Sequence, residues 1–212
     1  MEGKVKMFEL LFIRHGQTDW NLQSRVMGRQ PIPLNEKGKW QAKRLAAYLK
    51  GIKIDAMATS PVKRAMETAE ILLRGRQELQ LIVDERLSEI EYGDWLNLTF
   101  TDLATQYADI WKDYHQNPET VNIPGGEKLP HVCERTVQAI TEIRNRHPKG
   151  RLAIISHADV IKLAIIRLLK WPMNLFKCFS MDNGAMLLLR DHPTLGMRVI
   201  WYNPMNGFGR DL

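Results

Sequence analysis

The 212-residue chain is 44% hydrophobic and 25% charged, which is ordinary for a soluble globular protein. Its apolar runs are shorter than the roughly 18 residues of a membrane span, and no signal peptide is expected. The net charge of +6 comes from scattered Lys and Arg, so we expect neither a membrane nor a nucleic-acid partner. Cys133 and Cys178 lack metal-ligand spacing, which is typical of reduced thiols in a cytoplasmic protein.

Strand-like and helix-like patterns alternate along the chain. An apolar strand precedes Arg14, and a helix is predicted between Asn35 as cap and Gly51 as stop. A short strand at 56–59 leads into a helix for which Ser60 suits the N-cap and the following proline the first helical position. The other expected elements are a strand at 79–83, helices at 98–114 and 129–147, a strand and a buried helix within 151–170, and closing strands at 184–190 and 197–203.

The alternation continues without repeats or long linkers, which indicates one domain over residues 1–212. It favours an α/β fold with a mostly parallel central sheet that helices cover on both faces, a three-layer α/β/α sandwich. In such sheets, ligands bind beyond the carboxyl ends of the strands. The candidate site is therefore expected where the strands end.

Polar side chains gather at those strand ends. Arg14 and His15 follow the first strand, the segment 60–64 follows the second, and Ser156 and His157 follow a later one. Arginine forks match phosphate oxygens, and the starts of two helices would point backbone N–H groups at the same place. The sequence therefore predicts an anion site of the kind that binds phosphate.

The residue types also indicate a reaction. A neutral imidazole can attack phosphorus and form a phosphohistidine, while arginines offset the charge of the phosphoryl oxygens. The phosphate charge would raise the pKa of a nearby carboxylic acid from the stretch LSEIEYG, and this acid would protonate the leaving oxygen. This chemistry requires no metal and no cofactor, and no carboxylate cluster suited to magnesium is evident.

Several motifs occur together and in order between about residue 10 and residue 190. They are RHGQTDWN, GRQPIPLNEKGKWQA, ATSPVKRAMETAE, RLSEIEYGDW, PGGEKL and ISHADVIKLAI. The first matches Arg-His-Gly-x-Thr-x-x-Asn, and the third matches Ser-x-x-x-Arg-Ala-x-x-Thr-Ala, with Thr68 as its threonine. In these motifs the chain resembles the histidine phosphatase superfamily, also called phosphoglycerate mutase-like.

The resemblance implies roles for individual residues. His15 would be the phosphoryl acceptor, His157 the second pocket histidine, and Glu89 the proton donor because it lies four residues before Gly93. Glu91 is the competing carboxylate and is expected to be an exposed strand or loop residue. The expected substrate-binding residues are Arg14, Thr18, Asn21, Arg64, His157 and Ala158.

Supporting roles are expected for three further features of these motifs. Thr18 and Ser60 would bond phosphate or backbone, with loop and helix-cap roles favoured. Gly16 would permit a tight turn and a close approach of backbone to ligand.

The chain departs from the family pattern at two places. Leu96 and Asn97 stand where many members have Glu-Gly, and Ala158 and Asp159 stand where many have Gly-Gly. Ala158 keeps its backbone N–H for phosphate. Asp159 would oppose an anion if it pointed inward, and we expect it instead to favour the helix N-terminus.

The expected function is a metal-independent phosphomonoesterase that acts on a small phosphorylated substrate through a phosphohistidine. The alternative is a 2,3-bisphosphoglycerate-dependent phosphoglycerate mutase or a related phosphomutase. A non-catalytic phosphate-binding module is a third hypothesis, which the intact catalytic set opposes. Lys112 and His115 are the only cationic candidates between Gly93 and Pro124, which favours the phosphatase.

The leaving group is left open by the sequence. Sugar phosphates, nucleotide-like phosphates and phosphoproteins all fit, and Trp111 and Tyr114 would either wall a pocket or pack in the core. An exposed edge strand among the closing strands would allow a homodimer. The Gly-rich end 203–212 is expected to be a frayed terminus.

Overall fold

The first strand is buried on both of its faces. In the computed structural model, which describes residues 7–203, β1 (Phe8–Arg14) turns Leu10 and Phe12 into one core cluster. The alternate side chains Leu11 and Ile13 enter a second cluster on the opposite face. Because successive side chains of a strand point to opposite faces, this continuous apolar run makes β1 a central strand.

The described strands form one six-stranded sheet in the order β3-β2-β4-β1-β5-β6. β3, β2, β4 and β1 are parallel to their neighbours, whereas β5 pairs antiparallel with β1 and β6 antiparallel with β5. The bounds of the other strands are β2 Ala56–Thr59, β3 Leu81–Val83, β4 Gly150–Ser156, β5 Met186–His192 and β6 Gly196–Asn203. The predicted mostly parallel sheet with two closing strands is confirmed.

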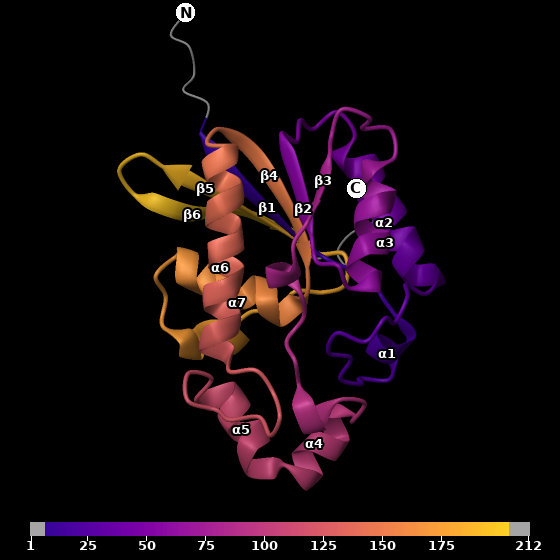
Figure 1. Cartoon of the computed structure of the whole chain (residues 1–212), viewed down its shortest axis with the longest axis vertical. Helices are drawn as coiled ribbons and strands as arrows, with labels where there is room; N and C mark the ends of the chain where they lie inside the picture. Colours follow the sequence, from indigo (N-terminus) through magenta and orange to yellow (C-terminus); the bar gives the residue numbers. More distant parts are fainter. Residues whose placement is uncertain (1–6, 204–212) are drawn as a thin grey trace, which may run out of the picture.

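Helices cover both faces of this sheet (Figure 1). α6 (Leu129–Arg146) and α7 (Ala158–Leu168) pack on the face that carries Leu10 and Phe12. α2 (Glu36–Leu49) and α3 (Lys63–Leu73) pack on the other face. The predicted three-layer α/β/α arrangement is therefore confirmed.

Shorter elements lie beyond the carboxyl ends of the parallel strands, where Figure 1 shows α1, α4 and α5. These elements come from several segments between the strands rather than from one continuous stretch of the chain. The bounds are α1 Asp19–Leu22, η1 Glu85–Leu87, η2 Gly93–Trp95, α4 Phe100–Gln106, α5 Ala108–Gln116 and η3 Met173–Lys177.

The predicted single helix over 98–114 is wrong, because the chain breaks into α4 and α5 at Tyr107. The ring of Tyr107 lies 6.3 Å from that of the fully buried Trp95, and the rings of Trp111 and Tyr114 lie 5.6 and 5.4 Å from it. Aromatic edge contacts of this kind stabilise a cluster beyond simple burial. The bend places Tyr107 and the aromatic side chains of α5 against Trp95.

The third helix also begins later than predicted. α3 starts at Lys63 with Val62 at the N-cap, so Ser60 is not the helix cap. Ser60 N donates to Ile155 O at 3.0 Å, which continues the pairing of β2 with β4, and Ser60 Oγ accepts from Val62 N at 3.2 Å. Sheet pairing thus extends one residue past β2 and delays the helix.

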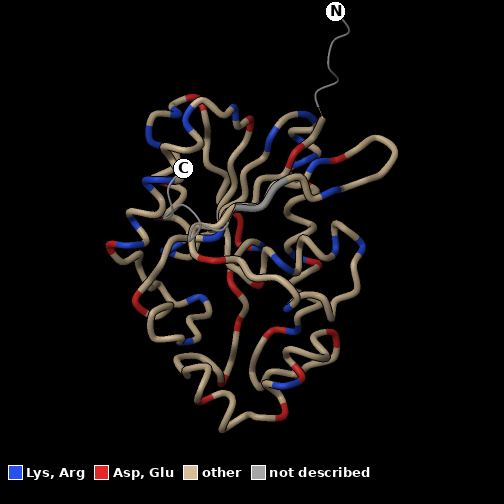
Figure 2. Tube along the Cα trace, turned by 180° about the vertical axis from the view of Figure 1, so that it is seen from behind, with Lys and Arg blue, Asp and Glu red and all other residues tan. Residues whose placement is uncertain are grey.

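Charged residues are spread along the chain, with Lys and Arg interspersed among Asp and Glu rather than collected on one face (Figure 2). Among residues 7–203, no helix is long and apolar enough to cross a membrane.

Two glycines bring the loop after β1 against the start of α2. A Cβ on Gly16 would lie 2.5 Å from Gly38 O, and a Cβ on Gly38 would lie 2.1 Å from Gln17 O. Gly16 is not among the glycines with positive φ. Packing against Gly38, rather than the tight turn expected from the sequence, therefore explains the need for glycine at position 16.

Replacing Gly38 by alanine should destabilise the fold by about 1–3 kcal/mol, because its Cβ meets rigid backbone. Chemical unfolding measures the change. Lys37→Ala, at the exposed neighbouring position of α2, is the matched control and should change stability by less than about 0.5 kcal/mol. Equal stability of Gly38→Ala and the wild type would contradict the close packing.

Candidate active site

The pairing of β1 with β4 brings two histidines together. Arg14 is opposite Ser156 at the ends of these parallel strands, so His15 and His157 follow as neighbours. His15 N donates to Ser156 O at 3.0 Å, and the two imidazole rings lie 5.2 Å apart. Both histidines are buried. The two histidine motifs, distant in sequence, thus meet as the sequence predicts.

His15 is held with one ring nitrogen directed into the site. Its Nδ1 lies 2.7 Å from Gly16 O, a carbonyl that can only accept, so Nδ1 carries the proton. Nε2 is therefore unprotonated, and its lone pair accepts a hydrogen bond from Arg64 Nε at 3.2 Å. Burial, followed by the charges of Arg64 and Arg14, holds the pKa of His15 well below its usual value. The imidazole is neutral at neutral pH, as a nucleophile must be.

His157 occupies the N-cap of α7, where its side chain makes no cap hydrogen bond. Its Nε2 lies 2.9 Å from Ser60 Oγ, a contact that fixes the ring. Burial lowers the pKa of His157 well below its usual value, and Arg64 lowers it further. Its Nδ1 is buried with no hydrogen-bond partner among the described residues. A buried polar atom of this kind is uncommon, and it lies 3.7 Å from Glu89 Oε2.

Two arginines flank the histidines. Arg64 is fully buried and donates from Nη2 to Gly28 O at 2.9 Å and from Nη1 to Gln30 O at 3.2 Å. Burial lowers the pKa of Arg64 to about 10, which leaves it a cation at neutral pH. Arg14 donates from Nη1 to Met181 O, while its Nε is buried without a partner among the described residues. The strand ends therefore carry two fixed positive charges.

Glu89 is the carboxylic acid of the site. Its side chain is 11% exposed, and its Oε2 lies 3.7 Å from both Arg64 Nη2 and His157 Nδ1. Burial raises the pKa of Glu89, although Arg64 opposes the rise. Glu91 is 51% exposed and pairs with Arg29 at 3.0 Å, outside this group. The structure thus separates the two carboxylates as expected.

The remaining predicted contacts lie in the loop after β1. Thr18 is the N-cap of α1 and forms a capping box with Asn21, so its expected cap role is confirmed. Asn21 Oδ1 accepts from Thr18 N at 3.0 Å and from Asn183 Nδ2 at 3.1 Å, which leaves Nδ2 for a ligand. Phosphate contacts from Thr18 and Asn21 stay predictions.

Ala158 begins α7, so its backbone N–H belongs to the first turn, where intrahelical acceptors are lacking. This position fits the expected phosphate contact. Asp159, in the same turn, lies in ion pairs with Lys162 and Lys177, and its negative charge is therefore compensated.

Some supporting residues were missed at the sequence level. Asn183 donates to His15 O at 3.2 Å, and Thr68 Oγ accepts from Gly16 N at 3.1 Å. Arg135 donates to the carbonyls of Ser88 and Glu89. Thr68 belongs to a matched motif, which was the available signal, whereas nothing around Asn183 or Arg135 marks them in one sequence.

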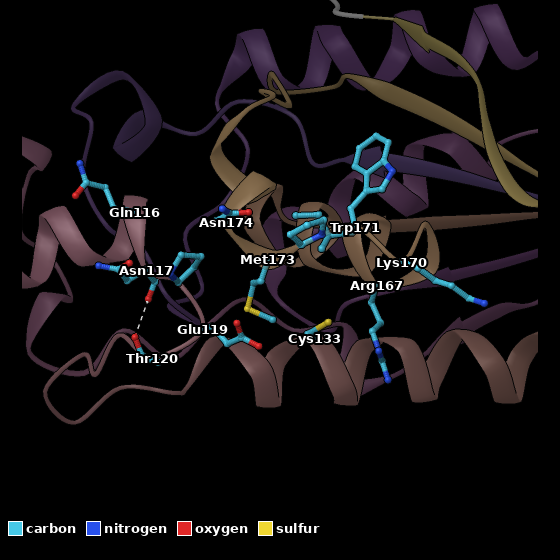
Figure 3. Close-up of a pocket in the computed structure, with 13 residues that line it drawn as sticks. Gln116, Asn117, Glu119, Thr120, Cys133, Arg167, Lys170, Trp171, Met173 and Asn174 are labelled. Carbon is cyan, nitrogen blue, oxygen red and sulfur yellow. Dashed lines mark hydrogen bonds between the residues drawn. The ribbon is translucent and has the colours of Figure 1, made fainter.

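A separate hollow of about 720 Å³ lies beside α7 and the residues that follow it (Figure 3). Glu119, Arg167 and Lys170 are among its lining residues, and it includes neither of the buried histidines. Within residues 7–203, no group of three or more His, Cys, Asp or Glu is arranged to hold a metal. The convergence of named side chains, rather than cavity size, identifies the candidate site.

This arrangement suits phosphoryl transfer. His15 Nε2, the guanidinium of Arg64 and the buried acid Glu89 lie together, and the charge of Arg14 acts on both His15 and Glu89. Fixed charges of this kind stabilise the equatorial oxygens of a transferring phosphoryl group.

Known proteins resemble this chain in sequence and in fold. Phosphoglycerate mutase-like protein 4 of Arabidopsis thaliana is 30% identical over 199 residues, with 88% of this chain and 86% of that protein covered. Phosphoserine phosphatase 1 of Hydrogenobacter thermophilus is 30% identical over 179 residues, with 84% of each covered. A mycobacterial glucosyl-3-phosphoglycerate phosphatase, solved with VO3, superposes with a TM-score of 0.82 at 28% identity and covers 92% of this chain and 98% of its own.

The sequence model of the histidine phosphatase superfamily (branch 1) matches residues 10–201, which include all the side chains of the candidate site. The match, the relatives and the geometry at the strand ends agree. The chain belongs to the histidine phosphatase superfamily.

Proposed function

We propose that the protein is a metal-independent phosphomonoesterase that passes the phosphoryl group of a small ester through His15 to water. The observation that carries this proposal is the unprotonated Nε2 of buried His15, 3.2 Å from Arg64 Nε. Relatives named as phosphatases of phosphoserine and of glucosyl-3-phosphoglycerate support the same reaction class.

In the first half-reaction, the lone pair of His15 Nε2 forms a bond to phosphorus. The bond from phosphorus to the ester oxygen breaks, and its electron pair stays on that oxygen. Glu89 gives its proton to the leaving oxygen and becomes a carboxylate. The alcohol leaves, and the phosphoryl group remains on His15.

In the second half-reaction, the Glu89 carboxylate accepts a proton from water while the water oxygen attacks phosphorus. The bond from phosphorus to Nε2 breaks, and its electron pair returns to His15. Inorganic phosphate leaves with Glu89 protonated again. Each group ends the cycle in its starting state.

Charge compensation comes from the chain itself. Arg14 and Arg64, whose charges act on His15, and the N–H groups at the start of α7 would bind the phosphoryl oxygens. Arg64 exchanges its bond to His15 for one to the phosphoryl group. A phosphoryl transition state needs mainly positioning and positive charge, both of which these residues supply.

A phosphoglycerate mutase is the second candidate, because one relative is named mutase-like. A mutase must hold the dephosphorylated sugar acid and return the phosphoryl group to another hydroxyl. Lys112 is exposed on α5, and His115 places Nδ1 2.7 Å from Trp111 O. With no paired arginines in this region to grip a carboxylate, hydrolysis is favoured.

Partners and location stay predictions. We expect a small phosphorylated substrate, no nucleic acid and a cytoplasmic location. A homodimer through the edge strand β6, where Val199 and Ile200 are exposed, also stays a prediction.

Assays in EDTA should release inorganic phosphate from a panel of esters without interconverting 3- and 2-phosphoglycerate. The panel includes phosphoserine, glycerol phosphate, a nucleotide-like monophosphate and p-nitrophenyl phosphate. Interconversion that depends on 2,3-bisphosphoglycerate would instead establish a mutase. Loss of all turnover in EDTA, with recovery on adding a divalent cation, would refute metal independence.

His15→Ala should lower kcat/KM by at least about a thousandfold, because the nucleophile is lost. Phosphate release from the best ester measures the change. His131→Ala, at an exposed histidine of α6, is the matched control and should retain wild-type turnover. Substantial activity in a folded His15→Ala protein would overturn the covalent mechanism.

Glu89→Gln should lower kcat/KM for alkyl esters by about 10²–10⁴-fold, because alkoxide is a poor leaving group without a proton. The loss for p-nitrophenyl phosphate should be less than about tenfold, since its leaving group hardly needs one. Glu91→Gln is the exposed control. Equal losses on both substrates in Glu89→Gln would assign the acid role elsewhere.

A further inference from the structure

A charged cluster that is mostly shielded from solvent adjoins the candidate active site: the side chains of Asp159, Lys162 and Lys177 are 14%, 7% and 23% exposed. Asp159 Oδ1 lies 2.6 Å from Lys162 Nζ, and its Oδ2 lies 3.1 Å from Lys177 Nζ. The same Oδ2 accepts from the hydroxyl of Tyr114 and, at 3.4 Å, from that of Tyr92. One carboxylate thus has four side-chain partners.

The cluster ties together segments that surround the site. Asp159 lies two residues after His157 in α7, and Tyr92 lies three residues after Glu89. Tyr114 comes from α5 and Lys177 from η3. Lys177 Nζ also lies 4.4 Å from the centre of the Tyr114 ring. Asp159 therefore links the helix that begins after one histidine to the segment that carries the acid.

Asp159 itself stays negatively charged, although the two lysines beside it compensate its charge. Lys162 and Lys177 hold the pKa of Asp159 far below its usual range despite burial, so the carboxylate stays ionised. Burial raises the pKa values of Tyr92 and Tyr114, so both phenols stay protonated and donate. The side chain of Asp159 is held by two lysines and two tyrosines.

Glu89 is subject to opposing charges. Arg64 and Arg14 favour its ionised form, which cannot donate a proton, whereas Asp159 favours its protonated form. The charged and titratable groups that face it are Arg14 from β1, Arg64 from α3, His157 and Asp159 from α7, Tyr92 from its own segment and Lys177 from η3. Arg29 and Arg135 bind its backbone carbonyl.

We propose that Asp159 is a positioning residue for the catalytic acid: a fixed buried charge that keeps the proton on Glu89 until the leaving oxygen takes it. Its bond to Tyr92 also holds the segment that carries Glu89. This inference rests on the proposed function, in which Glu89 protonates the leaving group.

The sign of the effect follows from the charges. Glu89 donates only while protonated, so kcat/KM for an alkyl ester falls as pH rises through its pKa. This fall is the basic limb of the pH profile. Asp159→Asn removes a negative charge, which lowers the pKa of Glu89 and moves the basic limb to lower pH. Lys177→Met removes a positive charge that attracts Glu89, and the limb moves to higher pH.

The experiment measures kcat/KM against pH for the best alkyl ester and for p-nitrophenyl phosphate. We expect the alkyl-ester limb to shift by about one pH unit downward in Asp159→Asn and upward in Lys177→Met. At a fixed pH on the limb, the first change costs about tenfold in kcat/KM. The profile for p-nitrophenyl phosphate, which needs no acid, should keep its basic limb in both variants.

Tyr114→Phe is the matched control, because it removes a hydrogen bond to Asp159 and leaves every charge in place. It should not shift the limb by as much as Asp159→Asn. Unshifted limbs in Asp159→Asn and Lys177→Met, or shifts in the same direction, would overturn the inference. If Asp159→Asn fails to fold, the double variant Asp159→Asn/Lys177→Met, which removes one charge of each sign, decides: its limb should lie at lower pH than that of Lys177→Met, and equal limbs would overturn the inference.

Failure of the inference is distinguishable from failure of the proposed function. Unshifted limbs with His15-dependent hydrolysis intact would refute the role of Asp159 alone. Hydrolysis that does not depend on His15 would refute the proposed function.

Discussion

The parallel pairing of β1 with β4 is the constraint on which the site depends. Because Arg14 and Ser156 are opposite each other, the residues that follow must emerge side by side. A shift of one residue would exchange the side chains that enter the two core clusters, Leu10 and Phe12 for Leu11 and Ile13, and would disrupt the close packing of both. Core packing thus sets the separation of His15 and His157 without any direct bond between them.

The site buries several ionisable groups, although removing a charged group from water is ordinarily unfavourable. Arg64 is fully buried, and backbone carbonyls of the segment between α1 and α2 accept from its guanidinium. Burial lowers the pKa values of both histidines and raises that of Glu89, so the same desolvation favours a neutral nucleophile and the protonated form of the acid. The uncharged forms are the ones that phosphoryl transfer to histidine requires at the start of its cycle.

An aromatic cluster around Trp95 supports one wall of this site. The bend at Tyr107 lets residues of α5 pack against Trp95, and Tyr114 extends from that cluster to Asp159. The half-buried Trp111 stacks on Tyr114, so both rings pack together instead of lining an open pocket. Apolar packing and the buried charge behind Glu89 are therefore parts of one arrangement.

The sequence by itself determined the alternating elements, the three-layer fold, the two histidines, the paired arginines and Glu89, because local periodicity and short motifs encode these features. Only the tertiary structure decided the break at Tyr107, the late start of α3 and the close packing that requires glycine at position 16, since each depends on a neighbour distant in the chain. The same holds for Asp159. Its first-turn position is local, but its charge is compensated by lysines and tyrosines from several elements, and long-range electrostatic contacts of this kind leave no pattern in one sequence.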